Sequence, residues 1–237
     1  MNPRILSGRR AYEFRRDDIR LTMLTTQPIR ELIGEQFHFR VADVGIPNPS
    51  FGQVQPTLPP GVVFDYGHVQ TTSELIVPIR YLHIEPLRIV IDVAGPSEFI
   101  DVIWGKLLDL LMPYRSPDGS FVIGEPERVL DYSEIALDIE LDPSSIMPAE
   151  FRAALQRAIG GLGEEGLAVV PMLFARAQRP TDEYPGVNVA DHRQFQFGLR
   201  ASSSLEHPTF FSAAPLDTKA HLVYLEDLLG KFGSTGS

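Results

Sequence analysis

The stretch that decides the fold runs from residue 86 to residue 111 and reads "PLRIVIDVAGPSEFIDVIWGKLLDLL". In its first half Ile89, Ile91 and Val93 alternate with other residues, which is the pattern of a β-strand with one buried face. In its second half apolar residues recur every three or four positions, which predicts an amphipathic helix. These residues are Ile100, Ile103, Trp104, Leu107, Leu108 and Leu111. The stretch therefore predicts a strand followed by a helix.

Further strand and helix patterns lie on both sides of this unit. Residues 132–141, "YSEIALDIEL", place aliphatic side chains on one face of a strand and carboxylates on the other. Residues 147–161, "MPAEFRAALQRAIGG", predict a helix that ends at two glycines. Other strands are predicted at 37–44, 62–69, 75–84, 167–176 and 194–201, and a last helix at 218–232. From residue 87 the predicted order is β-α-β-α-β-β-α.

Strands that alternate apolar and polar residues have one face in water, which favours an antiparallel sheet. The predicted fold class is therefore α+β, a mostly antiparallel sheet with helices packed on one face. A ferredoxin-like arrangement of the C-terminal part and a doubly wound parallel sheet are the alternatives. The predicted organisation is a β-rich part over residues 1–86 and an α+β part over residues 87–237, or one continuous domain.

Charge and cysteine content exclude several classes of protein. The net charge is −10, which opposes broad binding to nucleic acid. The chain has no cysteine, so disulfides, thiolate metal sites and a cysteine nucleophile are excluded. No apolar run reaches the length of a membrane span, and the first residues lack a signal-peptide pattern, so we expect a cytoplasmic protein without a membrane partner.

Common catalytic motifs are absent from the sequence. It contains no phosphate-binding G-x-x-x-x-G-K-[ST] loop, no G-x-G-x-x-G turn, no G-x-S-x-G elbow and no H-E-x-x-H pair. This lowers the expectation of a common NTPase, dehydrogenase, α/β-hydrolase or zinc protease. We expect no cofactor.

Two groups of residues are candidates for acid–base or metal chemistry within strands. His83 and Glu85 lie on the same face of the strand 75–84 and its extension, so they could act as a general base with its orienting carboxylate. Asp138 and Glu140 share the carboxylate face of residues 132–141 and could bind substrate or a hard cation such as Mg²⁺. The simpler interpretation of both groups is solvated side chains.

The N-terminal segment "RRAYEFRR", residues 9–16, interleaves two aromatic residues with four arginines. Such a pattern can clamp nucleic acid by stacking and charge. It also fits an edge strand with a charged outer face, which is the interpretation that we favour.

The last part of the chain contains His207 and His221 on either side of Asp217. The two histidines are candidate metal ligands, although their spacing matches no common metal motif. The alternative is that Asp217 caps the N-terminus of the last helix, which then buries a leucine stripe and ends at Gly233. We favour the capped helix.

The segment "FFSAAPLDTKAHLVYLEDL", preceded by "FQFGLR", and the segment "LHIEPLRIVIDVAG" resemble a sporadically distributed family of uncharacterised bacterial proteins. The resemblance covers about the C-terminal two-thirds of the chain. It implies a bacterial origin, and it assigns no activity and no catalytic residue.

The leading functional hypothesis is a non-enzymatic binding or interaction protein with a protein partner, including a homo-oligomer. The first alternative is a metal-assisted hydrolase or lyase that uses carboxylates and histidines. The second alternative is a nucleic-acid-associated protein that binds through its arginine-rich N-terminus, although a nucleic-acid partner is not expected from the net charge.

Overall fold

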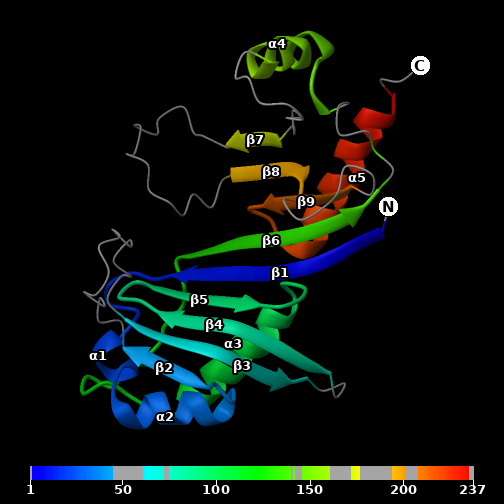
Figure 1. The fold of residues 1–237 in the computed structure, drawn as a ribbon. Helices are drawn as coiled ribbons and strands as arrows, with labels where there is room; N and C mark the ends of the chain where they lie inside the picture. Colours follow the sequence, from blue (N-terminus) through cyan, green and yellow to red (C-terminus); the bar gives the residue numbers. More distant parts are fainter. Residues whose placement is uncertain are drawn as a thin grey trace. The chain divides into compact units, whose positions relative to one another are not determined.

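The computed structural model describes residues 2–44, 61–71, 75–139, 141, 146–160, 172–176, 194–200 and 208–234 (Figure 1). The chain forms an α+β protein with antiparallel strand pairs. It divides into two compact units, which we call the N-terminal unit (Ser7–Tyr132) and the C-terminal unit (Met1–Leu6 with Ser133–Ser237). The predicted division at residue 86 differs from this one, because residues 84 and 89 are paired neighbours within the N-terminal unit.

The N-terminal unit is a sheet covered by helices on one face. Its strands lie in the order β2-β3-β4-β5-β1, and each neighbouring pair is antiparallel. The elements are β1 (Asn2–Glu13), α1 (Leu21–Leu24), α2 (Gln27–Gln36), β2 (Val41–Val44), β3 (Val62–Gln70), β4 (Ile76–Ile84), β5 (Arg88–Val93) and α3 (Phe99–Leu111). The first part of β6 (Arg128–Asp138) also belongs to this unit.

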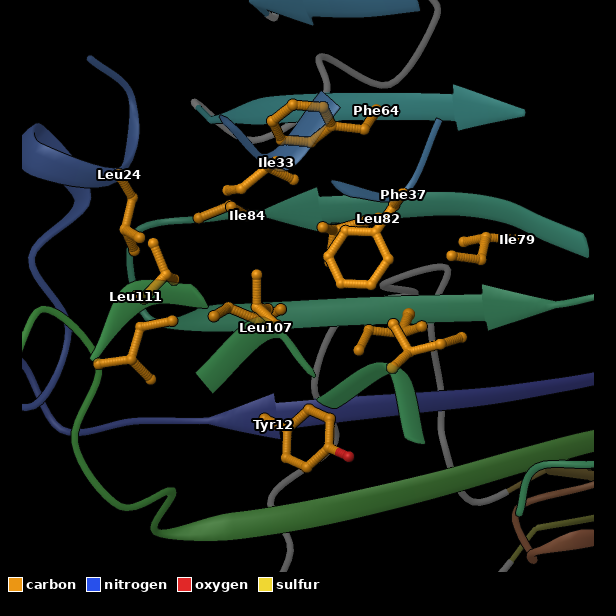
Figure 2. Packing of buried hydrophobic residues seen from close by; sticks show 14 of the residues in the cluster. Tyr12, Leu24, Ile33, Phe37, Phe64, Ile79, Leu82, Ile84, Leu107 and Leu111 are labelled. Carbon is orange, nitrogen blue, oxygen red and sulfur yellow. The ribbon is translucent and has the colours of Figure 1, made fainter. Parts of the chain in front are cut away.

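The core of the N-terminal unit lies between the sheet and its helices (Figure 2). Because side chains alternate along a strand, Leu82 and Ile84 of β4 point toward the helices. They are buried in the same cluster as the apolar stripe of α3, which includes Leu107. Tyr12 of β1 stacks on Trp104 of α3, with ring centroids 3.8 Å apart. The residues that alternate with these buried ones along the strands point to the opposite face of the sheet, away from α3.

The C-terminal unit has its own sheet and core. Its strands lie in the order β6-β9-β8-β7, and the neighbouring pairs are antiparallel. The elements after β6 are α4 (Ala149–Gly160), β7 (Met172–Arg176), β8 (Gln194–Leu199), β9 (Thr209–Ala214) and α5 (Thr218–Ser234). Ile135 and Leu137 of β6, Phe210 of β9 and Leu225 of α5 are fully buried in one cluster.

The two units share a connectivity that the sequence does not reveal. In each unit the first strand leads into a helix, a run of antiparallel strands follows, and the last strand of that run pairs beside the first. A helix then closes the unit, α3 in one and α5 in the other. The described elements of the C-terminal unit thus follow β-α-β-β-β-α, which differs from the β-α-β-β-α-β order of a ferredoxin-like fold.

Several strand and helix predictions are confirmed and others are wrong. The strands at 62–69 and 75–84, the strand–helix unit at 86–111 and the last helix are confirmed. The strand predicted at 37–44 is limited to Val41–Val44, because the preceding residues end helix α2, which was not predicted. The segment 210–215, which we expected to run as an extended apolar lead-in to the last helix, lies largely in the paired strand β9.

The N-terminal arginine segment is not an edge strand. Its residues 9–13 belong to β1, which lies between β5 and β6 in the strand order. Arg9 and Arg10 therefore have a strand on either side, and they pair with Asp92 of β5 and Asp131 of β6.

Candidate functional site

The face of the N-terminal unit's sheet that lies away from α3 carries a group of paired charged side chains. We call it the polar face. Strand register arranges its side chains in three rows across the strands. The first row contains Tyr81, Asp92 and Arg9, the second His83, Val90 and Ala11, and the third Arg88 and Glu13 with Glu85 at the end of β4.

The first row is built around a buried carboxylate. The Asp92 side chain is only 1% exposed, and its Oδ2 accepts hydrogen bonds from Nε and Nη2 of Arg9, both at 2.8 Å. A bulge in β4 between Ile79 and Tyr81 adds Arg80 to this face, where its Nε lies 3.8 Å from Asp92 Oδ1. Bulges commonly re-aim one side chain in this way.

Two tyrosines hold the Arg9 guanidinium in place. The guanidinium carbon lies 5.6 Å from the ring centroid of Tyr81 and 5.3 Å from that of Tyr132. Both are cation–π contacts. Burial raises the pKa of the Tyr81 hydroxyl to about 12, so the ring is neutral at physiological pH.

The third row begins at the hairpin between β4 and β5. Pro86 and Leu87 form the connection, and the backbone N–H of Glu85 donates to the carbonyl of Arg88 at 2.7 Å. This pairing places the two side chains side by side, and Arg88 Nε and Nη2 donate to the two Glu85 oxygens at 3.0 Å each. Such a bidentate pair fixes the orientation of both side chains and brings their opposite charges together.

His83 joins this ion pair from the second row. Its Nδ1 lies 3.1 Å from Glu85 Oε1, and both side chains are only 9% exposed. Burial opposes ionisation of Glu85, but the hydrogen bonds from His83 and Arg88 outweigh burial and lower the pKa of this carboxyl below its ordinary value. The ionised Glu85 carboxylate therefore accepts a hydrogen bond from the His83 Nδ1–H, and in this tautomer Nε2 is the acceptor nitrogen of the ring.

The His83 Nε2 atom is buried and has no hydrogen-bond partner within the described residues. An acceptor left in this state costs about 1–3 kcal/mol. A ligand that donates an N–H or O–H to Nε2 would recover that cost. The sequence prediction that His83 and Glu85 act together thus corresponds to a real contact, which Arg88 extends.

The second predicted group, Asp138 and Glu140, does not form such a site in what the structure describes. Asp138 is exposed, lies at the end of β6, and contacts Arg4 Nε at 3.5 Å and Thr209 Oγ1 at 3.2 Å. Glu140 lies outside the described residues. Ala136, which the alternation placed on the wet face with these acids, is fully buried.

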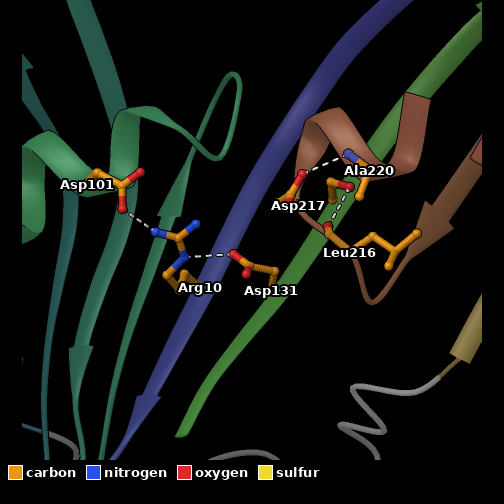
Figure 3. Close-up of polar contacts among 7 residues, drawn as sticks. Arg10, Asp101, Asp131, Leu216, Asp217 and Ala220 are labelled. Carbon is orange, nitrogen blue, oxygen red and sulfur yellow. Dashed lines mark hydrogen bonds and ion pairs between the residues drawn. The ribbon is translucent and has the colours of Figure 1, made fainter. Parts of the chain in front are cut away.

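Three of the four arginines in the segment 9–16 are paired with acids. Besides Arg9, Arg10 donates to Asp131 at 2.7 Å and also contacts Asp101 (Figure 3). Arg15 Nε lies 3.4 Å from Glu127. These pairings weaken the case for a nucleic-acid clamp, because neutralised arginines attract phosphate less.

In the C-terminal unit, Asp217 and His221 have structural partners. Asp217 Oδ1 accepts the backbone N–H of Ala220 at 2.8 Å, so the predicted helix cap is confirmed (Figure 3). Gly233, predicted to follow the helix, lies within α5. His207 lies outside the described residues.

His221 is fully buried between two serines that the sequence did not single out. Its Nδ1 lies 2.7 Å from Ser133 Oγ and its Nε2 lies 2.8 Å from Ser212 Oγ. The serines also lie within hydrogen-bond distance of backbone carbonyls, Ser133 of Leu216 and Ser212 of Gln196. Both ring nitrogens are therefore used inside the core and neither faces a metal position in this arrangement.

In the described part of the chain, histidine, aspartate and glutamate side chains form no group of three or more that could hold a metal ion. None of the helices described there is both long and apolar enough to cross a bilayer.

Comparisons with known proteins give no family for this chain: no family model, no curated protein and no solved structure matches it. The sequence singled out Arg9 only as part of the arginine-rich segment 9–16, and it missed Arg80, Arg88 and Asp92. Strand register, which is not readable from composition, is what brings them together.

Proposed function

We propose that this chain is a non-enzymatic binding protein and that the polar face of the N-terminal unit holds an anionic group of its ligand. The observation that carries this proposal is the layering of charge on that face. The carboxylates of Asp92 and Glu85 are buried, whereas the side chains of the arginines beside them are 33% exposed for Arg9, 44% for Arg80 and 27% for Arg88.

This layering suits anion recognition for two reasons. Arginine side chains that are partly exposed, beside carboxylates that are buried, place positive charge toward solvent, where an anion can approach. The buried acids and the tyrosines on either side of Arg9 also fix the arginines before a ligand arrives, which reduces the entropy lost on binding. A phosphate or a carboxylate has the geometry to accept such paired donors.

Titration calorimetry with pyrophosphate and with an oligoglutamate peptide tests this proposal and distinguishes phosphate from carboxylate ligands. We expect saturable binding of at least one probe, about tenfold weaker in Arg80→Gln, which corresponds to about 1.4 kcal/mol. Arg16→Gln, an exposed arginine of the same unit with the same change in charge, is the matched control and should bind like wild type. Equal affinities for the two variants, or no binding of either probe, would refute the proposal.

A second candidate function is general-base catalysis by His83, and the Arg88–Glu85–His83 chain favours it. Nε2 would accept a proton from water or from a substrate hydroxyl, and Glu85 would stabilise the imidazolium that forms. Under this alternative, a panel of phosphate and carboxylate esters would show turnover that disappears in His83→Gln. Turnover that persists in a folded His83→Gln protein would exclude it.

The protein partner that we propose includes a second copy of this chain, and β7 supports this. Among the described strands β7 ends the order and pairs with β8 alone, and Met172, Leu173 and Phe174 are exposed. An end strand can pair with its own copy in antiparallel fashion, which is self-complementary. Sedimentation should show a dimer that Phe174→Lys dissociates, and a wild-type monomer at high concentration would contradict this part of the proposal.

A further inference from the structure

A second feature of the N-terminal unit is independent of the polar face. At the C-terminal end of α3, on the helix side of the sheet, lies a hollow of about 350 Å³. One wall is formed by Leu108, Leu111 and Met112. The other is formed by the segment 121–125, which supplies Phe121, Val122, Ile123, Gly124 and Glu125.

The hollow is preformed, because both sides of the segment 121–125 are anchored. The Arg20 N–H donates to the Val122 carbonyl at 3.0 Å, and the Gly124 N–H donates to the Asp18 carbonyl at 2.6 Å. A side chain at residue 124 would come within 3.2 Å of Asp18, so glycine permits this close approach. On the outer side the Arg115 guanidinium lies 3.5 Å from the Phe121 ring centroid.

The lining is apolar apart from one carboxylate. Met112 and Phe121 are 53% and 52% exposed, an unfavourable state for large apolar side chains that an occupant would relieve. Interiors are normally packed without voids of this size, and the volume falls at the lower end of the range for ligand pockets, roughly 300–1,000 Å³. Glu125, the single ionisable residue of the lining, is exposed to solvent.

We infer that this hollow is a binding site for a small amphiphile with an apolar chain and a cationic end group. The apolar walls bury the chain, and the Glu125 carboxylate attracts the cation while it repels an anionic end group of the same length. An uncharged molecule of the same shape binds with intermediate affinity. The charge preference is the feature that separates this site from a simple packing defect.

Methionine-methyl NMR tests the inference, because the chain has five methionines and Met112 lines the site. The probes are octylamine, octanol and octanoate at concentrations below aggregation. Octylamine should shift the Met112 methyl signal saturably, with an affinity at least about tenfold higher than that of octanoate. The methyl of Met172, exposed on β7, reports non-specific association with apolar surface and should not move in the same range.

Two variants test whether Glu125 causes the preference for a cationic end group. Glu125→Gln should abolish the preference for octylamine over octanoate and leave octanol binding unchanged. Asp109→Asn, an exposed acid on α3 outside the lining, should behave as wild type. The inference is overturned if Met112 shows no saturable shift, if Met112 and Met172 shift in parallel, or if octanoate binds as tightly as octylamine. A shift of Met112 that depends only on protein concentration would instead assign the hollow to a second copy of the chain.

Discussion

At the scale of single residues, several polar side chains that are buried in the described part of the chain have more than one partner. His221 is the clearest case, because two serine hydroxyls bracket its ring. A neutral imidazole has one N–H and one acceptor nitrogen, so one serine accepts a hydrogen bond from the ring and the other can donate one to it. Protonation removes the acceptor nitrogen in a fully buried site, and burial lowers the pKa of His221 to about 4.

This lowered pKa predicts a pH-dependent stability of the C-terminal unit. The unfolded state binds a proton at His221 near pH 6.5, whereas the folded state binds one only near pH 4. Stability from this residue is therefore complete above about pH 6.5 and is lost as the pH falls toward 4, by about 3 kcal/mol in total. Amide exchange of β9 measured across this range should show the loss. In His221→Gln the loss over the same range should be smaller, and an unchanged pH profile would contradict the account.

The buried Asp92 gives a second prediction at the residue scale. Arg9→Met removes the closest counter-ion of Asp92 and should destabilise the N-terminal unit by about 3–5 kcal/mol, because a buried charge loses its compensation. Adding Asp92→Leu should recover much of that loss, since no buried charge then remains. Urea denaturation of the two variants checks both steps. If the double variant is less stable than Arg9→Met alone, the carboxylate does more than orient the arginines.

At the scale of elements, alternation was informative wherever a strand has one wet face. The first half of strand β4 could be predicted for this reason, whereas β5 has no wet face, because residues 89–93 are all buried. Helix α2 could not be predicted, because it buries only Ile29 and Ile33 fully and Leu32 is its one other large apolar residue. Strand β9 could not, because Phe210, Ser212, Ala213 and Ala214 are all buried, so it lies inside the sheet and its residues do not alternate.

Strand β6 offers a matched test of its two faces. Leu137 is fully buried in the core of the C-terminal unit, and Leu137→Ala should lower the free energy of unfolding by about 2–5 kcal/mol. Asp138 is the next residue and is exposed, and its contacts with Arg4 and Thr209 should contribute no more than about 1 kcal/mol. Thermal unfolding of the two alanine variants checks the difference. A large loss in Asp138→Ala would show that this carboxylate has a role that the structure does not reveal.

Only those residues of the candidate site that lie close together in the sequence could be predicted. His83 and Glu85 are two residues apart, so their shared face follows from strand geometry. Arg9 and Asp92 are 83 residues apart and meet only because β1 pairs with β5. No pattern in a single sequence contains that register, so the sequence placed Arg9 only on the charged outer face of an edge strand.

At the scale of the whole molecule, two units with one connectivity differ in what they expose. In the N-terminal unit the helix after the first strand, α2, buries its apolar residues, whereas the corresponding helix α4 exposes Phe151. The net charge of −10 also repels anions as a whole. A ligand with an anionic group must therefore find its attraction locally, and the polar face is where the described structure provides it.

The most direct test of this central claim is an NMR titration of the arginine side-chain Nε–H signals with pyrophosphate. The account predicts saturable shifts of Arg80, Arg9 and Arg88, with His83 side-chain signals moving along the same isotherm, while Arg16 stays in place. If all arginine signals drift together without saturation, or if the saturable shifts occur at arginines outside the polar face, the claim that this face binds an anionic group is wrong.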